Sequence, residues 1–382
     1  MLTRRNFVRT VGIGAAGALT SSWIGARGRE DSLWSVLEPG LHAQTAAPPA
    51  NMIVLSSNEN PLGPGKTVMD AVQKAFGPNG AAPGRYSSAV GALTEAIAKK
   101  HNVTPQNVLL ACGSTQILRT ATHVFTSRTK AMVGTIPTYE ECAGYAEMMG
   151  RPVRAVALDS SFRIDLDKFA DASKGAGLVF YCNPNNPTAT YVGARATRDF
   201  LAKVTRESPG TTVLVDEAYF EYVTASDYRS ALDLARERPN VIVLRTFSKI
   251  YSLASLRVGY AIGQPSTLAD LRRAQAPFTV NGLAQVAALT AVQYPNRVAE
   301  RAEFNAVQRG QVETALEERH VEFVPSQANF VYLRPGSIGQ DAFQAFLQLG
   351  VIVRQFGGGW VRVTIGSVEE NQRFLQALDS LL

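Results

Sequence analysis

Short apolar runs alternate with longer amphipathic stretches through the middle of this 382-residue chain. The runs carry almost no polar residues, which is typical of strands buried on both faces of a parallel sheet. The stretches between them are long enough to cross the sheet as helices, so the pattern predicts an α/β fold. We expect strands at Val108–Ala111, Ala131–Gly134, Gly177–Tyr181, Val213–Val215, Val241–Leu244 and Tyr260–Gly263.

The pattern changes after about residue 277, where a long helical stretch, Leu283–Arg319, is followed by shorter apolar runs. These runs predict a smaller α+β domain packed against the larger one. The expected strands are Glu322–Val324, Phe330–Leu333, Val351–Arg354 and Val361–Ile365, with a helix at Ala342–Gln348. The predicted organisation is a signal and linker (1–50), an N-terminal arm (51–80), a large domain (81–276) and a small domain (277–382).

Composition narrows the class of protein. The apolar fraction of 46% is that of a globular protein, and the net charge of +6 comes from scattered Lys and Arg rather than from a basic stripe. We therefore expect no nucleic-acid partner. The four histidines lie far apart and form no cluster with cysteine, so no metal site is expected. Cys112 and Cys182 follow apolar runs, and with Cys142 they are interpreted as buried thiols rather than a disulfide framework.

The first 50 residues have the features of a targeting signal rather than of a folded domain. Arg4 and Arg5 precede Phe7, a weakly hydrophobic run covers Val11–Ala18, and a Pro/Ala-rich stretch follows at 46–50. This segment resembles a twin-arginine export signal, which implies the export machinery as a partner and a periplasmic location. The apolar run is too short and too rich in glycine for a stable membrane span. An uncleaved membrane anchor and a cytoplasmic protein are the alternatives.

Polar residues collect where the predicted strands end. In a parallel sheet the carboxyl ends of the strands share one edge, and ligands bind there. The polar groups follow the first, third, fourth and fifth strands. They are Gly113–Gln116, Asn183–Asn186, Asp216 and Thr246–Lys249.

Lys249 is the central candidate, because a lysine directly after a buried strand needs a chemical reason. A partly buried amine beside another cation has a lowered pKa, and its neutral form attacks a carbonyl to give a Schiff base. Hydroxyls at Thr246 and Ser248, with the planar cation of Arg257, suit a phosphate dianion. The simpler alternative is a solvated lysine at the start of a helix.

Three further motifs agree with a bound phosphorylated ring, although each has an ordinary explanation. Asp216 ends a buried strand and needs a positive partner such as a protonated pyridine nitrogen, but it would also serve as a cap. Two prolines stiffen the loop Cys182–Thr188 and are expected to aim its amides at one place, although loop composition alone explains it. Ala111–Gln116 offers backbone N–H groups to an anion, or merely a helix N-cap.

Together these motifs resemble the class I/II pyridoxal-phosphate aminotransferases, most of all the histidinol-phosphate aminotransferases. The resemblance runs from about Ser56 to the C-terminus, and the order and spacing of the motifs carry it. It rests on SSNENP (Ser56–Pro61), RY (Arg85–Tyr86), PTY (Pro137–Tyr139), CNPNNPT, DEAY, TFSK with Arg257, ANF (Ala328–Phe330) and WVRVTIGS (Trp360–Ser367). It implies the fold-type I architecture, like that of aspartate aminotransferase, and pyridoxal 5'-phosphate as cofactor.

The resemblance also implies roles for individual residues. Lys249 would form the internal aldimine and then carry a proton, while Asp216 would keep the pyridine nitrogen protonated. Asn186 and Tyr219 would hydrogen-bond the ring oxygen, and Tyr139 would stack on the ring. The cofactor phosphate would be held by Ser114, Thr115, Thr246, Ser248 and Arg257, with Tyr86 reaching it from the partner subunit of a homodimer.

The substrate is left open. Arg362 would bind its α-carboxylate through a bidentate pair, and Asn60 would also contact the substrate. Arg354 would reach the distal end of the substrate or lie on the surface. Departures from the subgroup put histidinol phosphate in doubt as the substrate; they are Ala189, Gln116, Ser255 and the short connection Gln355–Gly359.

We therefore predict transfer of an amino group between an L-amino acid, or a histidinol-phosphate-like amine, and a 2-oxo acid. A decarboxylase, lyase or oxidase with the same cofactor is the alternative. A non-catalytic protein that binds the cofactor is a further one.

Overall fold

A computed structural model describes residues 51–77, 84–87, 90–336 and 341–382. All of these residues belong to one compact unit, Pro39–Leu382. The predicted export signal and linker, residues 1–50, lie outside the described residues. Within the described part of the chain, no helix is both long enough and apolar enough to cross a membrane.

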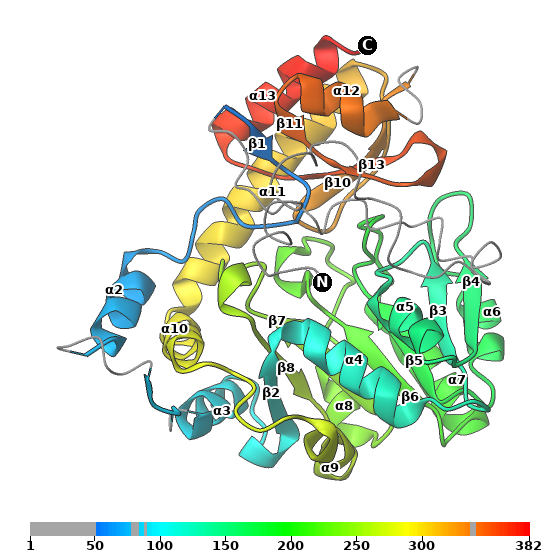
Figure 1. The fold of residues 1–382 in the computed structure, drawn as a ribbon. Helices are drawn as coiled ribbons and strands as arrows, with labels where there is room; N and C mark the ends of the chain where they lie inside the picture. Colours follow the sequence, from blue (N-terminus) through cyan, green and yellow to red (C-terminus); the bar gives the residue numbers. More distant parts are fainter. Residues whose placement is uncertain (1–50, 78–83, 88–89, 337–340) are drawn as a thin grey trace, which may run out of the picture. The chain divides into compact units, whose positions relative to one another are not determined.

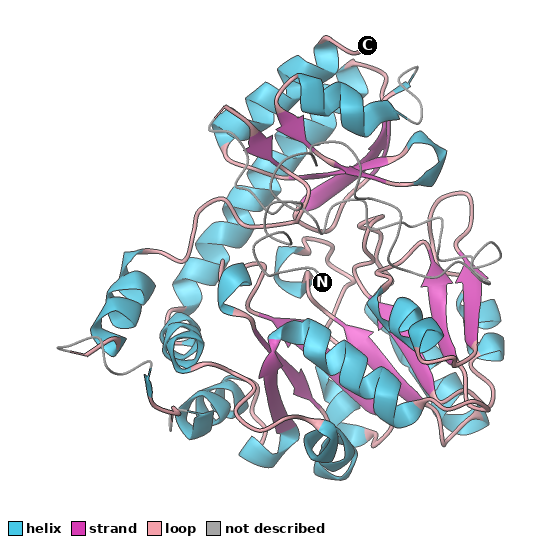
Figure 2. Ribbon diagram, in the orientation of Figure 1, coloured by secondary structure: helices cyan, strands magenta, loops and turns pink. Residues whose placement is uncertain are grey.

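A seven-stranded sheet forms the centre of the larger part (Figures 1 and 2). Its strands, in the order in which they lie side by side, are β2 (Val108–Cys112), β8 (Val258–Ile262), β7 (Val241–Thr246), β6 (Thr212–Asp216), β5 (Leu178–Cys182), β3 (Met132–Ile136) and β4 (Val153–Ala157). Strand β8 runs antiparallel to both of its neighbours, and the remaining pairs are parallel. The mainly parallel sheet predicted from the sequence is therefore present.

Helices cover both faces of this sheet. One face packs Val213, Val215, Val241 and Val243 against Phe200 and other apolar side chains of α6, α7 and α8. Because side chains alternate along a strand, the intervening residues face the other way, where Leu268 of α9 lies near Ile242. The helices of this part are α3 (Val90–Lys100), α4 (Gly113–Phe125), α5 (Glu141–Met148), α6 (Leu166–Ala172), α7 (Ala194–Glu207), α8 (Leu232–Glu237) and α9 (Pro265–Ala274).

The C-terminal part has its own antiparallel sheet and its own core. The strands lie in the order β12 (Arg354–Gln355), β13 (Val361–Thr364), β10 (Phe330–Arg334) and β9 (Glu322–Val324). A separate parallel pair joins β1 (Ile53–Val54) to β11 (Val351–Ile352), so the N-terminal arm is tied to this part. The helices of this core are α11 (Pro295–Glu318), α12 (Ala342–Gln348) and α13 (Val368–Asp379). The two remaining helices, α2 (Lys66–Ala75) and α10 (Gly282–Val292), pack with α3 and β8 in the core of the larger part.

Four predictions about local structure need correction. The stretch Leu283–Arg319 is two helices rather than one, because Pro295 cannot continue α10 but fits the first turn of α11. Strand β4 was not predicted, since its alternating polar residues mark a sheet edge rather than a buried run. The expected strand Val351–Arg354 is divided between β11 and β12. Cys112 is exposed, because it ends β2 at the edge of the sheet, whereas Cys142 and Cys182 are buried; all three are free thiols.

Candidate active site

A cavity of about 440 Å³ lies at the carboxyl ends of β2, β5, β6 and β7. These strands run in the same direction, so residues far apart in sequence meet at one edge of the sheet. Twelve of the predicted site residues line it: Ser114, Thr115, Tyr139, Asn186, Asp216, Tyr219, Thr246, Ser248, Lys249, Arg257, Arg354 and Arg362.

The turn from β2 into α4 leaves backbone N–H groups for an anion. Its N-cap, Cys112, makes no side-chain cap hydrogen bond, and the first turn of α4 has no acidic residue. Gly113 has a φ of +72°, and a Cβ there would lie 2.4 Å from Nη2 of Arg257. A Cβ on Gly259 of β8 would lie 2.3 Å from the backbone N of Ser114. The two glycines therefore let β8 and Arg257 approach the helix N-terminus closely.

Arg257 supplies the cation at this end of the cavity. Its Nη1 donates a hydrogen bond to the Ala254 carbonyl at 2.9 Å and lies 3.5 Å from Oγ of Ser248. The backbone N–H of Ser248 donates to Oγ1 of Thr246 at 3.0 Å. Together with Ser114 and Thr115, these groups offer a cation, hydroxyls and backbone N–H groups. That donor set fits a phosphate group.

Asp216 ends β6 and is 4% exposed. Its carboxylate accepts a hydrogen bond from the backbone N–H of Ala218 at 3.0 Å. Burial raises the pKa of Asp216 to about 7. Among the described residues no ion pair includes this side chain, so the carboxylate is short of positive charge. A protonated ring nitrogen would satisfy it.

The pKa of Lys249 is displaced in the opposite direction. Burial, reinforced by the positive charge of Arg362, lowers the pKa of Lys249 to about 7. Its Nζ donates a hydrogen bond to the Ser57 carbonyl at 2.8 Å and lies 5.9 Å from the centre of the Tyr219 ring. A large fraction of this amine is therefore neutral near neutral pH, as a nucleophile or general base requires.

Two phenols line the cavity beside Lys249. The hydroxyl of Tyr219 accepts a hydrogen bond from Nδ2 of Asn58 at 2.9 Å. Burial raises the pKa of both Tyr139 and Tyr219 well above the usual value. Both hydroxyls therefore stay protonated at neutral pH and remain able to donate hydrogen bonds.

The asparagines of the proline-rich loop do not act together, contrary to expectation. Asn183 exchanges two hydrogen bonds with the backbone of Val192. Asn185 binds the Pro137 carbonyl, at 3.0 Å, and two threonine hydroxyls. These two amides fix the loop and tie it to the turn at Pro137, because buried polar groups must find hydrogen-bond partners. Only Asn186 of the three lines the cavity.

Arg362 lies on β13 with 8% of its surface exposed. It donates to Oδ1 of Asn186 and to the Ser56 carbonyl, both at 2.5 Å. Its buried Nε has no hydrogen-bond partner among the described residues. Arg354 lies directly opposite on β12, and its Nη2 is 3.6 Å from Oε1 of Glu140.

Comparison with known proteins decides what this donor set belongs to. The model of the aminotransferase class I and II family matches residues 50–378. The chain belongs to this family. The prediction of a pyridoxal-phosphate-dependent aminotransferase is thereby confirmed. The donor set described above fits that cofactor: an anion cradle, a buried carboxylate short of a cation and a lysine with a lowered pKa.

Individual relatives agree with the family. The chain is 39% identical over 344 residues to the histidinol-phosphate aminotransferase of Moorella thermoacetica, covering 87% of this chain and 86% of that protein. In structure it resembles the histidinol-phosphate aminotransferase of Sinorhizobium meliloti in complex with pyridoxal-5'-phosphate, with a TM-score of 0.79, 23% identity, and coverage of 86% and 90%. It also resembles the aspartate aminotransferase of Thermus thermophilus with maleate, with a TM-score of 0.76, 20% identity, and coverage of 87% and 92%. The predicted fold-type I architecture is confirmed.

Two predicted residues of the aminotransferase site do not line the cavity. Asn60 donates to the Ile250 carbonyl at 3.3 Å and accepts from the backbone N–H of Leu62, so it holds the arm in place. Tyr86 is 81% exposed and stacks on Phe278 with ring centres 4.3 Å apart. A substrate contact for Asn60 and a phosphate contact from a partner subunit for Tyr86 remain predictions.

Eleven of the residues that line the aminotransferase cavity were not predicted as site residues, and three of them are considered further. Asn58 is the hydrogen-bond partner of Tyr219, Glu140 pairs with Arg354, and Phe356 lies beside Arg354. Asn58 falls inside the quoted SSNENP motif, and Glu140 directly follows the quoted PTY. Their positions in or beside these motifs could have marked them as site residues. Only the folded chain shows which neighbour each one contacts.

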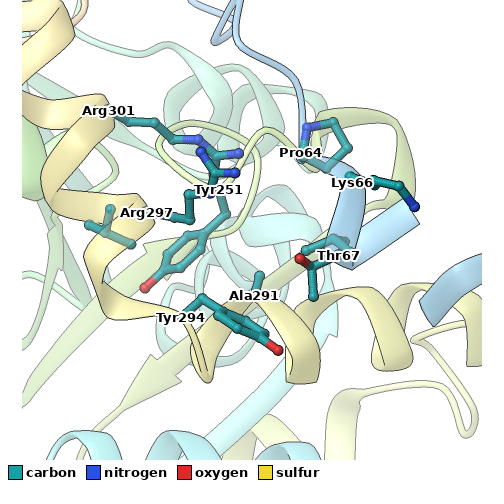
Figure 3. Close-up of a pocket in the computed structure, with 11 residues that line it drawn as sticks. Pro64, Lys66, Thr67, Tyr251, Ala291, Tyr294, Arg297 and Arg301 are labelled. Carbon is teal, nitrogen blue, oxygen red and sulfur yellow. The ribbon is translucent and has the colours of Figure 1, made fainter. Parts of the chain in front are cut away.

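A second and much smaller pocket lies apart from the aminotransferase site (Figure 3). Its volume is about 30 Å³, and its lining includes Lys66, Tyr251, Arg297 and Arg301. The guanidinium of Arg301 donates to the carbonyls of Gly63 and Ile250. This arginine therefore ties the N-terminal arm to the loop that follows Lys249, which is a structural task. A space of this size holds about one water molecule.

Proposed function

We propose that this aminotransferase moves an amino group between an L-amino acid, or a histidinol-phosphate-like amine, and a 2-oxo acid, and that it does so outside the cytoplasm. The observation that carries the transfer reaction is the convergence of Lys249, Asp216 and Arg257 on one cavity. The displaced pKa values of the first two groups suit a bound, positively charged ring.

Each of these residues has a task that its surroundings support. Pyridoxal phosphate, when bound, supplies an aldehyde and an electron-withdrawing ring. Arg257, with the N-terminus of α4, holds the phosphate, and Asp216 keeps positive charge on the ring nitrogen. Lys249, neutral for much of the time near pH 7, binds the aldehyde and later moves a proton from the substrate α-carbon.

Arg362 is suited to the substrate α-carboxylate. Its guanidinium is buried and oriented by Asn186 and Ser56, while its Nε lacks a partner among the described residues. A carboxylate would accept two parallel hydrogen bonds from this group. The phenols of Tyr139 and Tyr219 and the amide of Asn186 line the same cavity and would contact the cofactor ring.

The test is a half-reaction with one amino donor at a time. The loaded protein is mixed with single amino acids and with histidinol phosphate, and absorbance follows conversion of pyridoxal phosphate to pyridoxamine phosphate. We expect conversion with the true donor and full reversal on adding a 2-oxo acid. Lys249→Ala should lose conversion by several orders of magnitude. Release of carbon dioxide, elimination or oxidation without pyridoxamine phosphate would contradict a transaminase.

The location is supported by the residues before the fold. Arg4 and Arg5 precede a short, glycine-interrupted apolar run of the kind that marks twin-arginine export. That pathway carries folded proteins, which suits an enzyme that must acquire its cofactor before export. We include the export machinery among its partners.

We also infer a homodimer with a shared active site. Tyr86 and Phe278 are 81% and 65% exposed and stack on each other, which leaves two aromatic rings at the surface. A partner subunit would cover them and bring Tyr86 to the phosphate of the other site. Light scattering should give twice the mass of the chain, and a monomer at micromolar concentration would contradict the inference.

A further inference from the structure

A buried ion pair joins the ends of β6 and β7 on the side of the main sheet that packs against α8. The side chains of Arg245 and Glu217 are 5% and 2% exposed. Nε and Nη2 of Arg245 donate to Oε2 of Glu217 at 3.1 and 2.8 Å. Neither residue lines the cavity in the described part of the chain, so the pair can influence a ligand there only through other residues.

The segment before α8 completes the hydrogen bonds of this pair. Oε1 of Glu217 accepts from the backbone N–H of Ala231 at 2.7 Å, and the Ser230 hydroxyl donates to Oε2 at 2.7 Å. Nη2 of Arg245 donates to the same hydroxyl at 2.9 Å. The pair is therefore a fixed junction of three segments, because charges buried this deeply are costly without all their partners.

The guanidinium of Arg245 also lies against the chain that follows β6. Its Cζ is 3.9 Å from the centre of the Phe220 ring, close enough for a guanidinium to stack on an aromatic face. Phe220 begins a short 3-10 helix directly after Tyr219. The two contacts of Arg245 with this chain, at Glu217 and at Phe220, therefore stand on either side of Tyr219.

Each of the three junction residues, Glu217, Phe220 and Arg245, is next in sequence to a residue that lines the cavity. These neighbours are Asp216, Tyr219 and Thr246. Because successive side chains alternate along β7, Thr246 faces the cavity while Arg245 faces the junction. Lys249 follows Thr246 by three residues, so the same anchor precedes it in the chain.

Side chains must set the spacing of these segments, because the backbone ladder stops short of them. The pairing of β6 with β7 ends where the N–H of Glu217 donates to the Leu244 carbonyl at 2.9 Å. Tyr219 and Lys249 both lie beyond this point. A displacement of about 1 Å in a binding group can cost a large factor in rate, so a rigid junction here matters for the site.

We propose that Arg245 is a positioning residue for the cofactor, which holds the backbone of Asp216, Tyr219 and Lys249 at fixed distances from one another. The inference rests on the proposed roles of these three residues at the cofactor ring. Arg245 touches neither the cofactor nor the substrate and acts through Glu217 and Phe220.

The first test is Arg245→Lys, which keeps the charge but loses the planar group that reaches Glu217 and stacks on Phe220 together. The full-length, cofactor-free protein is titrated with pyridoxal phosphate, and we expect the affinity to fall by at least about tenfold. The circular dichroism of the bound cofactor, divided by its absorbance, should also change, because this ratio reports the orientation of the ring per bound molecule. Affinity and dichroism equal to those of the wild type would overturn the proposal.

The half-reaction separates the position of Lys249 from affinity for the donor. Arg362 belongs to β13 and not to the junction, so the donor concentration that gives half the maximal rate should stay within about threefold of wild type. The first-order rate constant at saturating donor should fall by at least about tenfold in Arg245→Lys. Partial unfolding cannot imitate this fall, because a first-order rate constant does not depend on how much protein is folded. A change confined to the half-saturating concentration would overturn the proposal.

A neutral pair tests whether the ion pair merely stabilises the fold. Glu217→Gln combined with Arg245→Met removes both charges and keeps an oxygen for the Ala231 N–H. Neutral residues can replace a buried ion pair without loss of stability, so the urea midpoint should fall in Arg245→Met alone and recover in the double variant. We expect the affinity for pyridoxal phosphate to stay at least about tenfold below wild type in the double variant. Recovery of affinity together with stability would overturn the proposal.

Arg151→Met is the matched control for the loss of an arginine. Nη1 of Arg151 donates to the carbonyls of Thr122, His123 and Thr126, at the end of α4 opposite the anion cradle. This variant should lose stability but keep its affinity for pyridoxal phosphate within about twofold. An equal loss of affinity here would show a general effect of destabilisation and would overturn the proposal. If no donor forms pyridoxamine phosphate, the transfer reaction fails, while affinity and dichroism still decide the role of Arg245.

Discussion

Two residues of the site have pKa values displaced in opposite directions by the same cause. Burial disfavours the charged form, so the carboxyl pKa of Asp216 rises to about 7 and the amine pKa of Lys249 falls to about 7. Without the cofactor, burial of these two groups therefore destabilises the folded state. A ring that carries positive charge beside Asp216 and an aldehyde beside Lys249 would relieve both penalties.

At the residue scale, the penalty at Asp216 predicts a pH dependence of stability for the cofactor-free protein. Its folded pKa exceeds the unfolded value of 3.8, so between these values the folded state binds more protons and stability falls as pH rises. Asp216→Asn removes this slope. We expect the variant to be more stable than the wild type at pH 8, by at most about 4 kcal/mol, with the difference vanishing near pH 3.5.

Urea denaturation of the cofactor-free proteins at several pH values measures the difference. Asp199→Asn, on the exposed side of α7, is the control for removing a carboxylate and should show no such slope. The Lys249 pKa acts in the other direction, since its penalty is full below pH 7 and disappears as pH rises toward 10.5. If the free energies of unfolding of the wild type and Asp216→Asn ran parallel from pH 4 to 8, the folded protein would already stabilise the Asp216 carboxylate, and the prediction would be wrong.

At the element scale, the turn between β2 and α4 depends on glycine for its geometry. Gly113 has a positive φ and leaves room for the guanidinium of Arg257, and Gly259 leaves room for the backbone of the turn. Both arrangements place backbone N–H groups and a cation around one point. The anion site is therefore a property of three packed elements rather than of the helix alone.

Gly113→Ala should damage this site specifically. The new Cβ would lie 2.4 Å from Nη2 of Arg257 in a backbone conformation that L residues rarely adopt, so the guanidinium must shift. We expect cofactor affinity to fall by at least about tenfold, measured by titrating the cofactor-free protein with pyridoxal phosphate.

The matched control is Gly144→Ala in α5. Nothing lies within 4 Å of a Cβ at that position, so the change should stabilise the helix by about 1 kcal/mol and leave affinity intact. Wild-type affinity in Gly113→Ala would contradict the close packing of Arg257 against the turn.

For the whole molecule, we propose that the protein is exported after it folds and before it meets its substrate. The described residues form the fold and the site, while Arg4 and Arg5 belong to a segment outside them. Replacing both arginines with lysine keeps the charge but removes the paired guanidiniums, which Lys does not reproduce. We expect periplasmic enzyme to disappear and a cofactor-loaded, active protein to accumulate in the cytoplasm.

Fractionation followed by the half-reaction assay checks this outcome. Because the substitution leaves every residue of the cavity lining unchanged, the activity of the retained protein serves as the control for folding. An unchanged periplasmic fraction would rule out the twin-arginine route.

The α/β class, six of the seven strands of the main sheet and about half of the cavity lining could be predicted from the amino-acid sequence. The prediction succeeded there because buried strands read as unbroken apolar runs, and polar residues at strand ends must meet at one edge. The prediction missed β4 because polar and apolar residues alternate along this edge strand. It joined α10 to α11 because the apolar pattern continues across Pro295.

Which polar groups are available for ligands became clear only from the packing of the folded chain. The fold uses Asn183 and Asn185 to hold their loop in place, leaves Asn186 at the site, and pairs Arg354 with Glu140. A side chain's partner depends on which elements pack together, and residues such as Glu140 and Arg354, 214 positions apart, carry no local sign of their contact. The cofactor can therefore be predicted from the sequence, whereas the charge of the cavity wall depends on how the elements pack.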